Sequence, residues 1–242
     1  MKTKKIQEIV YGINPVQELI KAKKRKVSMV YTTDPQPKAF SKILQSLPSY
    51  IEVRKVSKQH LENLSGTGDH QGVVALASPL QIRKKFFEPD KNPFLVLLDG
   101  VQDPRNLGAI IRSAYCTNAS GVLIPQKGSS PLTGTVNKAS AGLLERVDIF
   151  QAPSTVDCVK ELKSAGYNIF ISTLDKSASM TETKFLVPFC IVIGSEGTGV
   201  SKQILNQGQP VKIPQREADI SYNASVAAGI LFFYASEQNG LL

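Results

Sequence analysis

The sequence predicts an α/β protein whose larger, C-terminal part contains a parallel β-sheet. Two continuous apolar runs, residues 94–98 and 190–193, are bounded by polar turn residues, as is typical of strands that are covered on both faces. Strand and helix signals also alternate from residue 94 onward, which is expected when crossover helices connect parallel strands. Ligands of such sheets bind beyond the carboxyl ends of the strands. The polar loops that follow these runs are therefore candidate binding loops.

The first 77 residues carry helix and strand signals of their own. A helix is predicted over residues 15–24, and apolar runs at 27–31 and 73–77 predict strands, which is enough for a small α/β domain. Residues 78–92 then turn polar, basic and proline-containing, a composition typical of a linker. We therefore predict an N-terminal domain over 1–77, a linker over 78–92 and a second domain over 93–242.

The second domain continues the alternation of strand and helix signals to its end. These signals lie at residues 122–124, 156–165, 168–172 and 191–193. No internal repeat is evident, so a repeat architecture is not predicted.

The composition favours a polyanionic partner. The chain has 242 residues, 42% of them hydrophobic, and a formal net charge of +9, and an excess of lysine and arginine is typical of nucleic-acid binders. No apolar stretch is long enough to span a bilayer, and the first residues lack the apolar core of a secretory signal. A cytoplasmic protein is expected.

Cysteine and histidine usage predicts neither disulfides nor a metal site. Cys116, Cys158 and Cys190 are odd in number and far apart, so we expect each to be a small buried apolar residue. His60 and His70 are the only histidines and form no metal-ligand spacing.

Three polar segments each follow an apolar run and suggest one composite site. The first contains Asn106 and, nearly two helical turns later, Arg112. The second is the glycine-rich loop 194–199, which has neither the Gly-x-Gly-x-x-Gly order of a dinucleotide site nor the Gly-Lys-Ser/Thr ending of a phosphate loop. The third places Ser221 and Asn223 at the start of an apolar helix, where both residue types commonly cap free backbone N–H groups.

These segments resemble, in identity and order, the three motifs of the SpoU (TrmH-like) family of RNA ribose 2′-O-methyltransferases. The matching residues are Asp103-Pro104-Arg105-Asn106-Leu107-Gly108-Ala109 with Arg112, Gly194-Ser195-Glu196-Gly197-Thr198-Gly199, and Ser221-Tyr222-Asn223-Ala224-Ser225-Val226-Ala227. Pro131-Leu132-Thr133 and Ser140-Ala141-Gly142 match between the first and second motifs. Tyr11-Gly12-Ile13-Asn14-Pro15-Val16 and His70-Gln71-Gly72-Val73 resemble the N-terminal extension of the branch that modifies large-subunit ribosomal RNA. The resemblance covers nearly the whole chain.

The resemblance implies a fold and an activity that the residue patterns alone do not predict. It implies an RNA-binding domain like ribosomal protein L30e over residues 1–77, a SPOUT-like deep trefoil knot in the second domain, and a homodimer. The implied reaction moves a methyl group from S-adenosylmethionine to a ribose 2′-hydroxyl, with a guanosine of 23S ribosomal RNA as the expected target. A transfer-RNA ribose methyltransferase of the same family and a catalytically inactive RNA-binding assembly factor are the alternatives.

The resemblance also assigns site residues. It marks Asn106, Arg112, Glu196, Ser221 and Asn223 as catalytic, and it places Gly194, Ile213, Tyr222, Thr173, Leu174, Gly197, Asn223 and Ala227 at the cofactor. The arginine is often proposed as the general base in this family. Because a guanidinium does not normally lose its proton in a protein, we instead expect Arg112 to bind the substrate phosphate through its planar donor fork. The identity of the base is left open.

Two further features bear on substrate and cofactor. Lys21, Lys23, Lys24, Arg25 and Lys26, with Lys4 and Lys5 upstream, are expected to contact RNA, although such a run is often only a solvated face. The last motif of the family usually reads Ser-Leu-Asn-Val-Ser, whereas this chain has Tyr222 and Ala224 at the second and fourth positions. A larger ring beside a smaller neighbour keeps the volume similar, which cores tolerate. An active enzyme is still expected.

Overall fold

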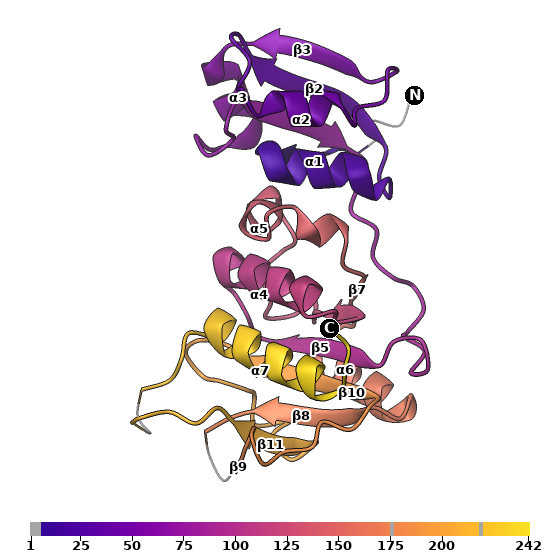
Figure 1. The fold of residues 1–242 in the computed structure, drawn as a ribbon, viewed down its shortest axis with the longest axis vertical. Helices are drawn as coiled ribbons and strands as arrows, with labels where there is room; N and C mark the ends of the chain where they lie inside the picture. The colour runs from indigo at the N-terminus through magenta and orange to yellow at the C-terminus, as the bar shows by residue number, and fades with distance from the viewer. Residues whose placement is uncertain (1–5, 175–176, 218–219) are drawn as a thin grey trace. The chain divides into compact units, whose positions relative to one another are not determined.

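The structure, a computed structural model, describes residues 6–174, 177–217 and 220–242 (Figure 1). It divides into two compact units: unit 1 consists of the chain up to Gln81 together with 132–146, and unit 2 consists of 82–131 and 147–242. Lys4 and Lys5 of the predicted RNA-contacting cluster lie outside the described residues.

Unit 1 contains a four-stranded sheet flanked by helices. Its elements are β1 (Glu8–Tyr11), α1 (Ile13–Ala22), β2 (Val27–Thr33), α2 (Phe40–Leu44), β3 (Glu52–Val56), α3 (Lys58–Ser65) and β4 (Val73–Ala77). The strand order is β1-β4-β2-β3, with β4 antiparallel to both its neighbours and β2 parallel to β3. The predicted helix and both predicted strands of this region are present, with the helix beginning two residues earlier than expected.

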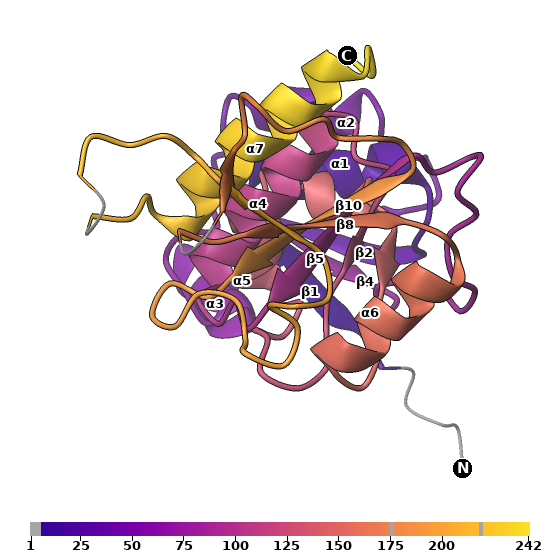
Figure 2. The ribbon, with the colours of Figure 1, turned by 90° about the horizontal axis from the view of Figure 1, so that it is seen from below.

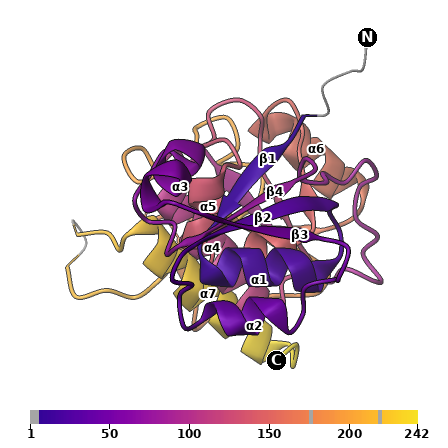
Figure 3. The same ribbon diagram turned by 90° about the horizontal axis from the view of Figure 1, so that it is seen from above.

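The two faces of this sheet are covered by different helices (Figure 3). On one face, Val16, Leu19 and Ile20 of α1 are buried against β-strand residues and α2, as their helical spacing predicts. On the other face, Leu61 of α3 packs with Val74. The Ser57 side chain caps α3 by accepting a hydrogen bond from the backbone N–H of His60.

Unit 1 also contains residues 132–146, which the sequence-based division assigned to the second domain. This segment forms the helix α5 (Gly134–Ala139) and the 3-10 turn η1 (Leu143–Glu145), and it buries Val136 and Leu144. The buried Glu145 carboxylate accepts a 2.8 Å hydrogen bond from Arg25. Arg25 is consequently buried and is not available to RNA, in contrast to the expectation for the basic cluster.

Unit 2 is built on a seven-stranded sheet in which every pairing is parallel. Its elements are β5 (Phe94–Asp99), α4 (Pro104–Cys116), β6 (Gly121–Leu123), β7 (Ile149–Phe150), α6 (Thr155–Ser164), β8 (Asn168–Ser172), β9 (Ala178–Ser179), β10 (Phe189–Gly194), β11 (Gln209–Lys212) and α7 (Ala224–Gln238). The strand order is β7-β6-β5-β10-β8-β11-β9. The predicted α/β class with a parallel sheet is confirmed.

Helices cover both faces of this sheet. Figure 2 shows α4 and α7 side by side on one face and α6 on the other. All residues of β5 and β10 are buried, which explains why these strands read as continuous apolar runs. The Ser236 hydroxyl of α7 donates a 2.6 Å hydrogen bond to the carbonyl of Thr117, which ties α7 to the end of α4.

One strand of unit 2 lies between two strands that are consecutive in the chain. β11 pairs with β8 on one side and with β9 on the other, although β8 and β9 both precede it. The chain after β10 therefore enters the space between β8 and the segment that follows it.

The region predicted as a linker is anchored in unit 2 from residue 82. Phe87 is buried in the core with Phe86 packed against it, and the Arg83 guanidinium lies 4.4 Å from the centre of the Phe87 ring. Arg83 also forms a 2.9 Å ion pair with Asp148. These apolar side chains hold the segment in place in spite of its polar composition.

In the described part of the chain, no helix has the length and apolar character needed to cross a membrane.

Candidate functional site

Motif residues from α4, the loop after β10 and the start of α7 meet at the carboxyl end of the sheet of unit 2. The first of these, α4, begins directly beyond β5. The Asp103 side chain accepts a 2.8 Å hydrogen bond from the backbone N–H of Arg105, and Pro104 occupies the first turn, where its missing N–H costs nothing. This start places Asn106 in the first turn of the helix.

The second motif forms a tight loop after β10. Ser195 and Gly199 exchange two backbone hydrogen bonds of 3.0 and 3.1 Å, and Gly199 has a φ of 65°. A side chain at Gly194 would lie 2.2 Å from the backbone of Gly199, so only glycine allows this close approach. The loop therefore folds back on its own strand and presents Glu196, which is exposed.

The third motif starts α7. Asn223 is the N-cap residue, and its Oδ1 accepts hydrogen bonds from Ser225 N at 2.9 Å and Ser225 Oγ at 2.6 Å. The capping role predicted for Asn223 is thus present in the structure, and it fixes the direction of the amide. The Nδ2 group faces the first motif.

A chain of side-chain hydrogen bonds connects the three motifs. Asn223 Nδ2 donates to Asn106 Oδ1 at 3.3 Å, and Asn106 Nδ2 donates to Glu196 Oε1 at 2.5 Å. The Asn106 amide is therefore held at both ends. Three of the five residues predicted to be catalytic form this one network.

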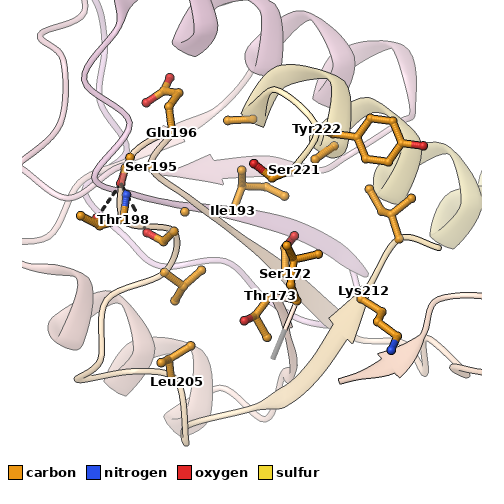
Figure 4. A pocket seen from close by; sticks show the side chains of 18 of the residues that line it. Ser172, Thr173, Ile193, Ser195, Glu196, Thr198, Leu205, Lys212, Ser221 and Tyr222 are labelled. Carbon is orange, nitrogen blue, oxygen red and sulfur yellow. Dashed lines mark hydrogen bonds between the residues drawn. The ribbon is translucent and has the colours of Figure 1, made fainter. Parts of the chain in front are cut away.

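A hollow of about 480 Å³ adjoins this network (Figure 4). We call it the cofactor hollow, after the residues predicted to bind the cofactor that are among its lining. Its lining residues are Ser172, Thr173, Leu174, Ile193, Gly194, Ser195, Glu196, Gly197, Thr198, Gly199, Val200, Lys202, Leu205, Lys212, Ile213, Gln215, Ser221, Tyr222, Ala224 and Ala227. Figure 4 shows Ile193 near the middle of the view, Glu196 and Leu205 above and below it on the left, and Tyr222 beside the start of α7.

The structure gathers most of the predicted site residues around this hollow. Seven of the eight residues predicted for the cofactor line it, namely Gly194, Ile213, Tyr222, Thr173, Leu174, Gly197 and Ala227, and so do the predicted catalytic residues Glu196 and Ser221. Asn223 does not line it, because its amide caps α7 and contacts Asn106. Arg112 does not line it either. It lies exposed on α4, and the structure gives it no hydrogen bond or ion pair within the described chain.

Several lining residues were not predicted from the sequence. Ser172 and Lys212 directly precede the predicted Thr173 and Ile213 at strand ends, so their position on the same two loops was a usable signal. Lys202 and Leu205 come from the segment after the glycine-rich loop. That segment contains no recognisable motif, and only the three-dimensional fold brings it to the hollow, so these two residues could not be found from the sequence.

The N-terminal motif residues gather in unit 1. Gln71 Oε1 accepts a 3.2 Å hydrogen bond from Ile13 N, and the Tyr11 hydroxyl donates to Thr135 Oγ1 at 3.3 Å. His70 is buried, its Nδ1 accepts a 2.9 Å hydrogen bond from the backbone N–H of Gly72, and burial lowers the pKa of its imidazole. Each motif thus has a structural role in holding this unit together.

The cysteines have no place in the site. Burial raises the pKa of Cys158 to about 12 and that of Cys190 well above its ordinary value, so both thiols are protonated and inert at neutral pH. Cys116 is exposed, which corrects the expectation that all three are buried. It occupies the last position of α4. Among the described residues, no group of three or more His, Cys, Asp and Glu side chains could hold a metal ion.

Two family models match the chain. Residues 93–233 match the SpoU rRNA methylase family, and residues 9–83 match the RNA 2′-O ribose methyltransferase substrate-binding domain.

Two curated relatives match nearly the whole of this chain. The 23S rRNA (guanosine-2′-O-)-methyltransferase RlmB of Blochmanniella floridana is 29% identical over 245 residues, covering 96% of each chain. A protein of Mycolicibacterium gilvum, described as an uncharacterized tRNA/rRNA methyltransferase, is 30% identical over 243 residues, covering 97% of this chain and 77% of its own.

Solved structures have the same fold. An RNA 2′-O ribose methyltransferase superposes with a TM-score of 0.85 at 22% identity, covering 98% of this chain and 90% of that one. An AdoMet-bound rRNA methyltransferase from Sinorhizobium meliloti superposes with a TM-score of 0.79 at 23% identity, covering 98% and 88%.

Proposed function

Because the chain belongs to the SpoU rRNA methylase family, we propose that it methylates the ribose 2′-hydroxyl of a guanosine in 23S ribosomal RNA. Its family makes it an RNA 2′-O-methyltransferase, and the AdoMet-bound structure with the same fold supports S-adenosylmethionine as its cofactor. The 23S guanosine is supported by RlmB relatives that match over nearly their full length. The single observation that carries the catalytic proposal is the hydrogen-bonded chain from Glu196 through Asn106 to Asn223 beside the cofactor hollow.

The hollow fits the proposed cofactor. Its volume of about 480 Å³ lies in the range of small-molecule sites. Buried Ile193 and Val200 and the partly buried Leu205 offer apolar surface for an adenine ring, while Lys202 and Lys212 offer cations to a carboxylate. S-adenosylmethionine, when bound, supplies an electrophilic methyl group on a sulfonium.

The polar network is proposed to position the target ribose. Asn106 retains a fixed amide orientation because Glu196 and Asn223 hold both its ends. Such fixed groups accelerate a transfer reaction by bringing the attacking oxygen into line before the reaction. We assign Asn106 and Ser221 to the ribose, with Glu196 and Asn223 holding Asn106.

Arg112 is proposed to bind the phosphate next to the target ribose. It follows Asn106 by six residues on α4, and it is exposed. An exposed guanidinium that has no carboxylate partner among the described residues can give both arms of its fork to a phosphate. Charge and geometry thus support a positioning role without requiring the guanidinium to lose a proton.

We further propose a homodimer, a trefoil knot and a cytoplasmic location. The helix α7 is largely apolar, and its Val226 and Phe233 are 48% and 57% exposed, while Tyr115 of the neighbouring α4 is 43% exposed. Such apolar surface is suited to a second copy. The placement of β11 between β8 and β9 supports the knot. The cytoplasm is where the proposed RNA substrate resides.

The test is a comparison of 2′-O-methylation maps of 23S ribosomal RNA and transfer RNA from cells with and without this protein. We expect one guanosine of 23S RNA to lose its methyl group and to regain it with the wild-type protein but not with Arg112→Ala. Loss in transfer RNA alone would favour the transfer-RNA alternative. Unchanged maps of both RNAs would favour the inactive assembly factor.

A further inference from the structure

A second hollow, of about 330 Å³, lies against the cofactor hollow in unit 2. It is lined by Asp99, Gly100, Gln102, Gly128, Ser195, Glu196, Gly197, Thr198, Gly199 and Ser201. Residues 195–199 line both hollows. A single loop therefore separates a ligand in the second hollow from the cofactor.

The lining of the second hollow, which includes Asp99 and Glu196, suits a polar and flat ligand that carries no negative charge. No lysine or arginine is among its lining residues, whereas Lys202 and Lys212 line the cofactor hollow. The second hollow is therefore a poor site for a phosphate, which is bound by cationic side chains. Its glycines leave peptide groups accessible, and a flat ring can approach them closely.

Two polar side chains of this hollow, Asp99 and Gln102, differ in how far their hydrogen-bonding groups are already used within the protein. Asp99 is 6% exposed, and each of its carboxylate oxygens accepts a hydrogen bond, from Thr155 Oγ1 at 2.6 Å and from Ser201 N at 2.7 Å. It therefore fixes the wall of the hollow. Gln102 is exposed and has no hydrogen-bond partner within the described chain. Its amide offers two donor hydrogens and an acceptor oxygen to a ligand.

Glu196 connects the second hollow to the proposed ribose site. It lines the hollow and also accepts the hydrogen bond from Asn106. The base of a nucleotide is attached to the ribose carbon next to the one that carries the 2′-hydroxyl. A ribose held at Asn106 must therefore place its base in a space that adjoins the ribose site, as the second hollow does.

Building on the proposed function, we infer that the second hollow receives the base of the target nucleotide and that Gln102 is a specificity-determining residue. Proteins that read RNA splay bases out of the helix and hydrogen-bond to their edges, and enzymes that modify nucleotides commonly hold the extruded base in a pocket. The Gln102 amide can match the neighbouring donor and acceptor groups on the edge of guanine. Phosphate and ribose contacts then remain with Arg112 and Asn106.

The experiment uses the full chain and the variants Gln102→Ala and Gln102→Trp, with Gln203→Ala as a control, because Gln203 is exposed in the same unit and does not line either hollow. Methyl transfer from labelled S-adenosylmethionine is measured on a 23S RNA transcript and on transcripts in which adenosine or inosine replaces the methylated guanosine. Calorimetry measures S-adenosylmethionine affinity, and NMR line broadening measures binding of guanosine 5′-monophosphate.

We expect Gln102→Ala to lower kcat/KM on the guanosine transcript by about 10- to 100-fold, as for the loss of one recognition contact, and to reduce discrimination against the other bases. Gln102→Trp fills the hollow and should block both turnover and nucleotide binding. Both variants should bind S-adenosylmethionine like the wild type, and Gln203→Ala should resemble the wild type throughout.

Normal turnover and base discrimination by Gln102→Trp would overturn the base site and leave the proposed function intact. Loss of S-adenosylmethionine affinity in both Gln102 variants would also overturn it, because the hollow would then belong to the cofactor. A wild type that transfers no methyl group to any RNA would contradict the proposed function. In that case, undiminished binding of guanosine 5′-monophosphate by Gln102→Trp would separately refute the base site.

Discussion

Asn106 and Glu196 are 90 residues apart in the chain, yet Asn106 Nδ2 donates a 2.5 Å hydrogen bond to Glu196 Oε1. The bond joins the first turn of α4 to the glycine-rich loop that lines both hollows. Asn223 holds the other end of the Asn106 amide. Asn106 is thus the residue that connects the three motifs through side-chain hydrogen bonds.

Replacing Asn106 with aspartate should introduce repulsion at this junction. Asn106→Asp places two carboxylates at hydrogen-bonding distance, and like charges this close oppose joint ionisation. We expect methyl transfer at neutral pH to fall by about 100-fold, the effect of a small misplacement in a positioned site. Lower pH should restore part of the activity relative to the wild type, because one shared proton restores a hydrogen bond.

The pH profile of Asn106→Asp is compared with that of Asn106→Ala. The alanine variant loses the hydrogen bond without gaining a charge, so its activity relative to the wild type should not improve at lower pH. If both variants show the same profile, repulsion from Glu196 is not the cause of the loss.

Arg112 provides a test of phosphate binding. Arg112→Ala should abolish most methyl transfer while S-adenosylmethionine affinity and Tm stay close to the wild type, because substitution of an exposed helical side chain changes stability little. Arg112→Lys keeps the charge without the planar fork and should remain strongly impaired. Lys160→Ala on α6, also an exposed charge, is the control. Near-normal turnover with Arg112→Lys would show that charge alone suffices.

The gathering of the motif residues could be predicted from the sequence, whereas the division into units could not be predicted in full. The motifs follow buried strands, and the carboxyl ends of parallel strands share one edge, so Asn106, Glu196 and Ser221 could be placed together in advance. Residues 132–146 could not, because Val136 and Leu144 are apolar without any local pattern that tells which of two cores buries them. The same holds for Arg25, whose lysine neighbours indicate an exposed cluster. Of its two carboxylate partners, Glu8 and Glu145, the buried Glu145 lies 120 residues away.

The buried pair Arg25–Glu145 should make unit 1 sensitive to substitution. The Arg25 and Glu145 side chains are 2% and 1% exposed, and breaking a buried pair costs about 3–5 kcal/mol because one charge is left without its partner. Arg25→Met should lower the free energy of unfolding by this amount in chemical denaturation. Adding Glu145→Gln should recover part of the loss, since it removes the unpaired charge.

The stability of Arg25→Met should also depend on pH. Burial already raises the pKa of Glu145 above its ordinary value of 4.5, against the opposing effect of Arg25, and loss of Arg25 should raise it further. A carboxyl group with a raised folded-state pKa stabilises the fold when protonated and loses that contribution as the pH rises through this pKa. The deficit of Arg25→Met should thus be largest at neutral pH and shrink as the pH falls. A deficit below about 1 kcal/mol at neutral pH, typical of exposed pairs, would contradict the buried pair.

The exposed lysines after α1 should contribute to RNA affinity through charge. Lys23 and Lys26 are both exposed, and each phosphate contact adds about 0.7 to 0.9 to the slope of log affinity against log salt. Lys23→Ala/Lys26→Ala should therefore weaken binding of 23S RNA at low salt and reduce that slope by roughly 1.4 to 1.8. S-adenosylmethionine affinity, measured in parallel, should not change. An unaltered slope would mean that these lysines form only a solvated face.

Tyr222 and Ala224 should be coupled in the cofactor hollow, because both line it in place of the leucine and valine that are usual in the family. Tyr222→Leu removes ring surface from the lining of the hollow and Ala224→Val adds volume to it, so each should weaken S-adenosylmethionine binding. The double variant exchanges both volumes at once, which cores tolerate better than a net change. The loss of binding free energy in the double variant, measured by calorimetry, should be smaller than the sum of the two single losses. The expected difference is about 0.5 to 3 kcal/mol, the range for contacting residues. Strictly additive effects would show that the two side chains shape the hollow independently, and the departure from the usual motif would then need a separate cause at each position.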